Sequence, residues 1–346
     1  MRILSVVGNR PQYIKLAAIH RAIGSNEHLI VNTGQHYDYE MVDIFFKEFS
    51  LPATEFALGV GSGTHAAQTA KCMERLEEPI LTLDPDIVYV YGDTNTTLAG
   101  AIVAKKLGYP VGHIEAGCRS GEPFFIEEIN RKCVDHISDI LFCPSVHCVE
   151  NLFLEGIRFG AYYTGDVMVD ILKMILPELT PKKDGEYVVA TIHRAENTDN
   201  RRNLLNIINA FSECGKEVIF VVHPRTQKKI SEFTISINSN VELSTPVDYY
   251  SLMSLVKGAS QVVTDSGGLQ KEAFILGVPC ITVRPATEWI ETLECGWNQL
   301  VKPEKLSKYI GNNQPKRPGV TVNYYGNGIA AKKIIERTKV FIEELS

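Results

Sequence analysis

The chain has 346 residues, a length typical of two domains, and its 45% hydrophobic and 22% charged content is that of a folded protein. Its net charge of -6 supplies no basic field, so we expect no nucleic acid as a partner. The N-terminus lacks a signal-peptide core and no segment approaches the roughly 20 apolar residues of a membrane span, so we expect a cytoplasmic protein without membrane contact.

Short apolar runs rich in β-branched residues alternate with helical stretches along the chain. Five come before residue 177 and four after it, in the order ILSVV, HLIVN, DIVYVY, VGHIEA, DILFCP, YVVATI, EVIFVV, SQVVTD and VPCITV. Continuous apolar strands of this kind are typical of parallel sheets covered by helices on both faces. The pattern predicts an α/β protein that binds its ligands at the carboxyl ends of the strands.

A polar, proline-bearing segment divides the two groups of strands. It reads PELTPKKDGE and predicts a linker over 177–186, between a first domain at 1–176 and a second at 187–327. The remaining residues, 328–346, have apolar side chains at helical spacing and predict a closing helix.

The first strand ends in GNRPQYIK, where Pro11 suits the first turn of a helix. Arg10 stands at the strand end and Lys15 about one turn into the helix. Both are candidates for substrate binding, and both could equally be surface residues at a helix start.

Acidic residues follow the third and fourth strands. Asp93 lies in YGDTNTT, Glu115 in HIEAG, and Glu127 and Glu128 at the start of the next helix. Each has a plain alternative, since Asp93 could cap a helix and the glutamates could offset a helix dipole. Carboxylates gathered at one edge of a sheet repel one another, however, and this favours a catalytic use of Asp93, Glu115 and Glu127.

Two histidines follow strands of the second half. His193 ends YVVATIH, and His223 ends EVIFVVH, with Arg225 two residues further on. A structural role would suit either histidine alone, whereas two at strand ends favour ligand binding or proton transfer.

The sequence VVTDSGGLQKEA predicts a strand followed by a turn and a helix. The free amides of Ser266, Gly267 and Gly268 and the positive end of the helix would suit a phosphate, although Ser-Gly also begins ordinary helices. Glu272 lies one turn later and would reach a ribose diol.

Cysteine and histidine residues cluster between residues 133 and 148, but they lack the paired spacing of a zinc site. We therefore expect no metal, and we expect the chain's eight cysteines to be reduced thiols. The members of this stretch are Cys133, His136, Cys143, His147 and Cys148.

Taken together, these motifs resemble the series of the non-hydrolysing UDP-N-acetylglucosamine 2-epimerases. Nine of them occur in one order between residues 8 and 291: GNRPQYIK, TGQH, YGDTNTT, HIEAG, IEEINR, HRAEN, HPRT, DSGGLQKEA and TEWIE. The resemblance implies two Rossmann-like domains facing across a cleft in the GT-B arrangement, with the C-terminal helix returning to the first domain. It also implies a homodimer that makes a precursor for polysaccharide biosynthesis.

The resemblance also implies roles for the candidate residues. Arg10, His223, the Ser266–Gly268 turn and Glu272 match UDP-binding positions, and Asp93, Glu115, Glu127 and His193 match catalytic ones. The implied reaction inverts carbon 2 of UDP-N-acetylglucosamine by eliminating UDP, which leaves 2-acetamidoglucal, and adding it back. Neither a cofactor nor a metal is implied.

Some residues depart from the family pattern. The first loop reads GNRPQ where many members have GTRPE, and Ala195 and Lys71 stand where arginines are common, which does not favour an activating second UDP-sugar site. Other features look closer to a sister group acting on UDP-2,3-diacetamido-2,3-dideoxyglucuronate. A GT-B glycosyltransferase and a UDP-sugar sensor without catalysis stay open as alternatives.

Overall fold

The computed structural model describes residues 1–34, 45–122, 125–181, 187–311 and 323–345. Gln35 and His36 of the TGQH motif, and residues 182–186 of the predicted linker, lie outside these ranges. The chain forms two compact units. Unit 1 comprises Met1–Met174 and Asn323–Ser346, and unit 2 comprises Ile175–Val322.

Unit 1 is built on a seven-stranded parallel sheet in the order β3-β2-β1-β4-β5-β6-β7. Its elements in the described ranges are β1 (Arg2–Val7), α1 (Arg10–Ala22), β2 (Glu27–Asn32), β3 (Phe56–Ala57), α3 (His65–Leu83), β4 (Ile87–Tyr91), α4 (Asn95–Lys106), β5 (Val111–Ile114), α5 (Ile126–Ile137), β6 (Ile140–Cys143), α6 (Val146–Leu154), β7 (Ala161–Tyr163), α7 (Val167–Ile175) and α14 (Ala330–Leu345).

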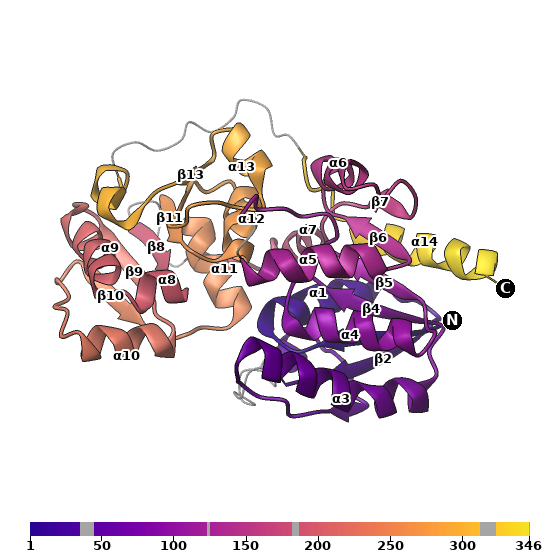
Figure 1. Cartoon of the computed structure of the whole chain (residues 1–346). Helices are drawn as coiled ribbons and strands as arrows, with labels where there is room; N and C mark the ends of the chain where they lie inside the picture. The colour runs from indigo at the N-terminus through magenta and orange to yellow at the C-terminus, as the bar shows by residue number, and fades with distance from the viewer. Residues whose placement is uncertain (35–44, 123–124, 182–186, 312–322, 346) are drawn as a thin grey trace. The chain divides into compact units, whose positions relative to one another are not determined.

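Helices cover both faces of this sheet. The α3, α4 and α5 helices lie side by side over one face, and α1 and α14 pack together on the other (Figure 1). Successive side chains of β4 point to opposite faces of the sheet and so contact both helix layers. Val88 and Val90 pack in the core with α3 and α4. On the other face, the Tyr89 hydroxyl lies 2.5 Å from the Thr338 hydroxyl of α14.

Unit 2 is built on a six-stranded parallel sheet in the order β10-β9-β8-β11-β12-β13. Its elements in the described ranges are β8 (Tyr187–Thr191), α8 (Ala195–Thr198), α9 (Arg201–Glu213), β9 (Glu217–Val221), α10 (Pro224–Glu232), β10 (Val241–Ser244), α11 (Tyr249–Gly258), β11 (Gln261–Thr264), α12 (Gly267–Leu276), β12 (Cys280–Thr282), α13 (Ile290–Glu294), β13 (Asn298–Leu300) and the 3₁₀ helix η1 (Pro303–Lys308).

The strand order reverses once in each sheet. In unit 1 the chain moves from β1 to β2 in one direction and from β4 to β5 in the other, and in unit 2 the same reversal separates β8 from β11. Loops diverge at such a point and leave room for a ligand at the carboxyl ends of the strands. The two parallel sheets with alternating helices confirm the predicted α/β class of two Rossmann-like domains.

Nine strands coincide with the nine apolar runs of the sequence, but four further strands were not predicted. These are the edge strands β3, β7, β10 and β13. They have two to four residues each and mostly exposed or half-buried side chains, so they lack the apolar run by which the central strands are recognised.

None of the helices in the described ranges combines the length and the apolar character that crossing a bilayer requires.

Candidate active site

The loop between β1 and α1 brings residues of the first motif to the switch point of unit 1. The Asn9 side chain caps α1 by accepting from the Gln12 amide nitrogen at 3.3 Å. Arg10 begins the helix with its guanidinium 5.1 Å from the ring centroid of Phe45. The Gln12 carboxamide accepts from Gly8 N at 2.8 Å and donates to Tyr91 O at 2.9 Å, which ties the end of β1 to the end of β4.

Lys15 and Glu115 form a nearly buried ion pair. The Lys15 Nζ lies 2.5 Å from the Glu115 Oε1, with 8% and 11% of the side chains exposed. Glu115 has a φ of 77°, a left-handed conformation that costs about 1–3 kcal/mol outside glycine. A Cβ on Gly92 would lie 3.2 Å from Lys15 Nζ and 3.4 Å from Glu115 Oε1, so glycine lets the β4 turn approach this pair.

Asp93 follows Gly92 and forms an ion pair with Arg131 of α5. Arg131 also contacts the buried Glu128 at 3.1 Å, and the Asn130 carboxamide donates to Asp93 O at 2.8 Å. One face of α5 therefore holds the turn that carries Asp93. Capping is not the role of Asp93, because Thr94 is the N-cap of α4.

Glu127, the third predicted acid, is partly exposed in the first turn of α5. Its neighbour Glu128 is buried and accepts from the amide and hydroxyl of Ser120 at 3.0 and 2.9 Å. The two adjacent glutamates thus differ in role. Glu128 binds the Ser120 loop and Arg131, whereas Glu127 lies partly exposed in the first turn of the helix.

A second buried ionic network lies behind these acids. His113 Nε2 donates to the carbonyl of Gly92 and its Nδ1 contacts Asp135 Oδ1, both at 2.7 Å. Asp135 also accepts from Gly117 N at 3.1 Å and pairs with Arg119 at 2.8 Å. Burial by itself would raise the pKa of the Asp135 carboxyl, but His113 and Arg119 hold that pKa below its usual value.

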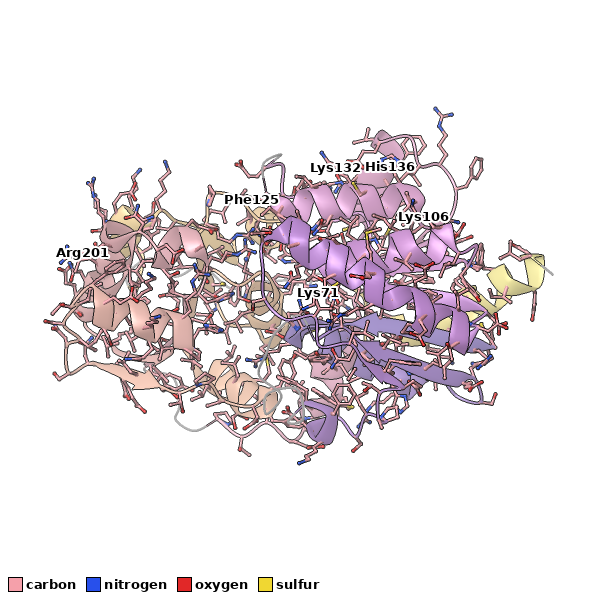
Figure 2. The ribbon with its side chains drawn as sticks, turned by 60° about the horizontal axis from the view of Figure 1, so that its bottom comes forward. Lys71, Lys106, Phe125, Lys132, His136 and Arg201 are labelled. Atoms are coloured by element: carbon pink, nitrogen blue, oxygen red, sulfur yellow. The ribbon has the colours of Figure 1, made fainter. Side chains whose placement is uncertain are left out.

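The helix α5 separates these charges from the solvent. Figure 2 shows Phe125 at the start of α5, with Lys132 and His136 further along it. Lys132 and His136 are exposed, whereas Arg131 and Asp135 are at least 96% buried. A helix that buries paired charges instead of apolar side chains gains little stability from them, which points to a functional use.

In unit 2, the ends of β8 and β9 bring the two predicted histidines together. The rings of His193 and His223 have centroids 6.2 Å apart. His223 caps α10 by accepting from Arg225 N at 3.2 Å, and Arg225 pairs with Asp199 at 2.5 Å in an exposed position. His193 has 42% of its side chain exposed and contacts the buried Asp265.

The Ser266 turn opens α12 as the motif predicts. The Ser266 hydroxyl caps the helix, Gly267 and Gly268 form its first turn, and Glu272 is buried. Around Gly268 an added Cβ would meet nothing within 4 Å, so there is open space beside this residue. The predicted free amide of Ser266 is wrong, because Ser266 N donates to the Thr264 hydroxyl at 2.9 Å. A Cβ on Gly267 would instead lie 2.5 Å from Glu288 Oε1, so a carboxylate already approaches this turn.

Across the described part of the chain, no three histidine, cysteine or acidic side chains are placed to hold a metal ion. All eight cysteines are described and none forms a disulfide.

Sequence reasoning missed the residues that hold these side chains in place. In unit 1 these are Gln12, His113, Glu128, Arg131 and Asp135, and in unit 2 the residue is Asp265. One signal was available, because Glu128, Arg131 and Asp135 are spaced by three and four residues and so share one face of a helix.

The chemistry of each unit follows from these groups. Unit 1 presents carboxylates beside a lysine and an arginine, which suits proton transfer and stabilisation of a cationic transition state. Unit 2 presents histidines and helix amides, which suits an anionic group.

Comparison with known proteins adds independent information. A family model described as UDP-N-acetylglucosamine 2-epimerase matches residues 19–339. A UDP-N-acetylglucosamine 2-epimerase homolog of Methanococcus maripaludis is 45% identical, over 97% of this chain and 99% of its own. A UDP-2,3-diacetamido-2,3-dideoxy-D-glucuronate 2-epimerase of Pseudomonas aeruginosa is 40% identical over 97% and 99%.

Among solved structures, the UDP-GlcNAc 2-epimerase of Methanocaldococcus jannaschii in complex with UDP-GlcNAc and UDP matches with a TM-score of 0.88. It is 38% identical, and the match covers 98% of this chain and 100% of that one.

Proposed function

Because the chain belongs to the UDP-N-acetylglucosamine 2-epimerase family, we propose that it interconverts UDP-N-acetylglucosamine and UDP-N-acetylmannosamine by inverting carbon 2. The observation that carries this proposal is the group of acids at the switch point of unit 1. Asp93 and Glu115 follow adjacent parallel strands, and each is paired with a buried cation. Inversion at carbon 2 needs acid-base groups of this kind.

The reaction proceeds by elimination and re-addition. A base removes the proton from carbon 2, the electrons of that bond form a double bond to carbon 1, and the bond from carbon 1 to the phosphate oxygen breaks. UDP leaves with the electron pair of that bond, and 2-acetamidoglucal remains bound. A proton then reaches carbon 2 from the opposite face while UDP adds back to carbon 1. Two proton-transfer groups are therefore required.

We assign the two tasks to the two units. Asp93, Glu115 and Glu127 of unit 1 transfer protons and stabilise positive charge on the sugar ring. In unit 2, Arg225, His223, the turn of Ser266 with the amides of Gly267 and Gly268, and Glu272 bind UDP, and His193 stabilises the departing diphosphate. Two residues of unit 1 contribute as well. Arg10 binds UDP, and Lys15 acts through its ion pair with Glu115.

Incubation with UDP-N-acetylglucosamine in deuterated water tests the reaction directly. We expect deuterium at carbon 2 and the manno epimer in the same NMR spectrum, because the solvent supplies the returning proton. A protein that yields neither signal is not an epimerase of this substrate.

Substitutions test the acids. We expect Asp93→Asn and Glu127→Gln each to lower kcat by at least about 100-fold, because each removes a proton-transfer group, while UDP still binds. Glu150→Gln on the exposed side of α6 is the matched control, with a side chain 65% exposed, and should keep wild-type turnover. Equal turnover in all three variants would refute the assignment.

The sugar itself needs a separate experiment. One relative named for UDP-N-acetylglucosamine and one named for the diacetamido-glucuronate are each 40% identical to this chain. Parallel assays with the two UDP-sugars decide between them. We expect the higher kcat/KM for UDP-N-acetylglucosamine, and a higher value for the uronate would reassign the substrate.

We further propose a cytoplasmic homodimer that supplies an activated sugar for polysaccharide synthesis. The eight unpaired thiols suit a reducing compartment. Phe153, Leu154 and Phe159 are 61%, 81% and 90% exposed, which provides apolar surface for a partner. Light scattering coupled to size-exclusion chromatography should give twice the monomer mass, and a monomer mass would refute the dimer.

A further inference from the structure

Asp265 of unit 2 lies at the end of β11, directly before the Ser266 turn, and is fully buried. Its carboxylate accepts from His193 N at 3.0 and 3.2 Å, from Arg194 N at 3.0 Å and from Asn197 Nδ2 at 2.9 Å. The His193 ring adds Nδ1 at 3.2 Å from Oδ1. One carboxylate thus holds the backbone of His193 by hydrogen bonds and lies within ion-pair distance of its ring.

The groups around Asp265 determine whether its carboxyl group donates or accepts hydrogen bonds. The two backbone amides and the Asn197 amide group only donate, so the carboxylate faces donors alone and acts as an acceptor. At 3.2 Å from this acceptor, we expect the His193 Nδ1 to carry a hydrogen, because a lone pair there would face the negative oxygen. The Nε2 of His193 is the ring nitrogen that does not contact Asp265, and the side chain is 42% exposed.

The neighbouring histidine has the opposite arrangement. His223 Nδ1 accepts from the backbone amide of Arg225 at 3.2 Å and so carries no hydrogen. The hydrogen of a neutral His223 is then on Nε2. Two rings 6.2 Å apart are thus set in different tautomers by different partners.

We propose that Asp265 is a positioning residue that fixes the tautomer and orientation of His193, so that its Nε2 serves the departing diphosphate. The part played by the diphosphate rests on the proposed function. Asp265 takes up no proton. Its negative charge compensates an imidazolium at His193, which can then donate from Nε2 to the phosphate oxygen as the bond to carbon 1 breaks.

A purely structural anchor would not need the ring contact. The backbone amides of His193 and Arg194, together with Asn197, already hold the β8 loop to Asp265. Asp265 also fixes the phosphate turn, since its own carbonyl accepts from Arg194 Nε at 3.0 Å and Ser266 is the next residue. The same residue therefore places both the histidine and the turn.

Nitrogen-15 NMR of the histidine rings in the wild-type protein tests the first part without any change of sequence. Assignment uses the variants His193→Asn and His223→Asn. We expect Nδ1 of His193 to be protonated and Nδ1 of His223 to be unprotonated, both before and after UDP is added. An unprotonated Nδ1 at His193 overturns the proposal.

The variant Asp265→Asn tests the second part. An asparagine turns an amide group toward several donors and cannot compensate an imidazolium, so we expect kcat to fall by about 100- to 1000-fold, with KM changed much less. Asp248→Asn, at the exposed N-cap of α11, is the matched control and should keep wild-type kcat, because asparagine caps a helix as well as aspartate does.

The outcomes separate this inference from the proposed function. A wild-type protein that does not turn over UDP-N-acetylglucosamine refutes the function, and the NMR result still decides the tautomer. A folded Asp265→Asn protein with wild-type kcat refutes the positioning role. If that variant does not fold, the ring signals of the wild-type protein decide alone whether Nδ1 of His193 is protonated or unprotonated.

Discussion

Gln12 shows how a single side chain can connect two strands of the site. The residue is 1% exposed, and its carboxamide contacts Gly8 N, Tyr91 O, and the hydroxyls of Thr94 and Thr97. The amide group supplies both the acceptor for Gly8 N and the donor for Tyr91 O that this position uses.

We expect Gln12→Met to lower the free energy of unfolding by at least about 2 kcal/mol, because it leaves Gly8 N without its buried acceptor and removes one of the two side-chain donors to Tyr91 O. Urea unfolding measures the change. The control is Gln227→Met in α10, where the side chain is exposed and the free energy of unfolding should stay within about 0.5 kcal/mol of wild type. Equal effects in the two variants would contradict this account of Gln12.

His28 belongs to a chain of polar groups inside unit 1. Its Nδ1 lies 3.0 Å from Nδ1 of His20, and its Nε2 lies 2.8 Å from the Ser5 hydroxyl, which meets the Tyr91 hydroxyl at 2.7 Å. Burial, and then the charge of His20, lower the pKa of His28 to about 3. The folded protein thus keeps His28 neutral at pH values where the unfolded chain protonates it.

This depressed pKa makes stability depend on pH. The contribution of His28 is complete above pH 6.5 and is lost as the pH falls from about 6.5 toward 3, at up to about 1.4 kcal/mol per pH unit. We expect the stability difference between wild type and His28→Gln to shift by about 2 to 3 kcal/mol in favour of the variant between pH 7 and pH 4.5. Urea unfolding at several pH values measures it, and a constant difference would contradict the prediction.

At the scale of elements, α5 is the scaffold of the acid site. Its inner face carries Glu128, Arg131 and Asp135, and each is paired with a group on another segment or a neighbouring turn. Arg131 is 4% exposed and connects α5 to Asp93 after β4.

We expect Arg131→Met to destabilise the protein by about 3 to 5 kcal/mol and to lower kcat by at least about 100-fold, because two carboxylates lose their buried partner. Thermal unfolding and turnover measure the two effects. Lys132→Met, on the exposed side of the same helix, is the control and should change neither. An active and stable Arg131→Met protein would show that α5 does not support the site.

Elements also differ in how well the sequence predicts them. The central strands of both sheets were recognised because both of their faces are buried, as in β4, where all five residues are apolar or aromatic and buried. Edge strands such as β7 and β13 have one neighbour and partly exposed side chains, so their pattern resembles that of a loop.

Glu127 and Glu128 could not be distinguished by their spacing in the sequence, because the start of a helix does not reveal which side of the helix faces the sheet.

At the scale of the whole molecule, the chain leaves unit 1 and returns to it. Residues 323–346 belong to unit 1, where Asp170 of α7 accepts from the first two amides of α14 at 3.0 and 2.8 Å. Ile334 and Ile335 are buried there, so the last helix forms part of the core of unit 1.

Removal of residues 323–346 should therefore destabilise unit 1 by at least about 3 to 6 kcal/mol, from the burial of the two isoleucines alone. Both tryptophans, Trp289 and Trp297, lie in unit 2 and report on it separately. We expect the circular dichroism melt to begin at a lower temperature while the midpoint of tryptophan fluorescence stays in place.

The double substitution Lys332→Ala and Glu336→Ala, on the exposed side of α14, is the control and should leave both signals unchanged. A truncated protein in which both signals shift together would show that the two units unfold as one.

The sequence by itself determined the α/β class, the nine central strands and the placing of acids and histidines at strand ends, because periodicity and turn chemistry are local properties. Only the tertiary structure decided which of these residues meet. Lys15 and Glu115 are 100 residues apart, and Asp93 and Arg131 are 38 apart. Such contacts depend on the order of strands around β1 and β4, and on the face that α5 turns to the sheet. The same long-range packing places Asp265 against His193, across 72 residues of chain.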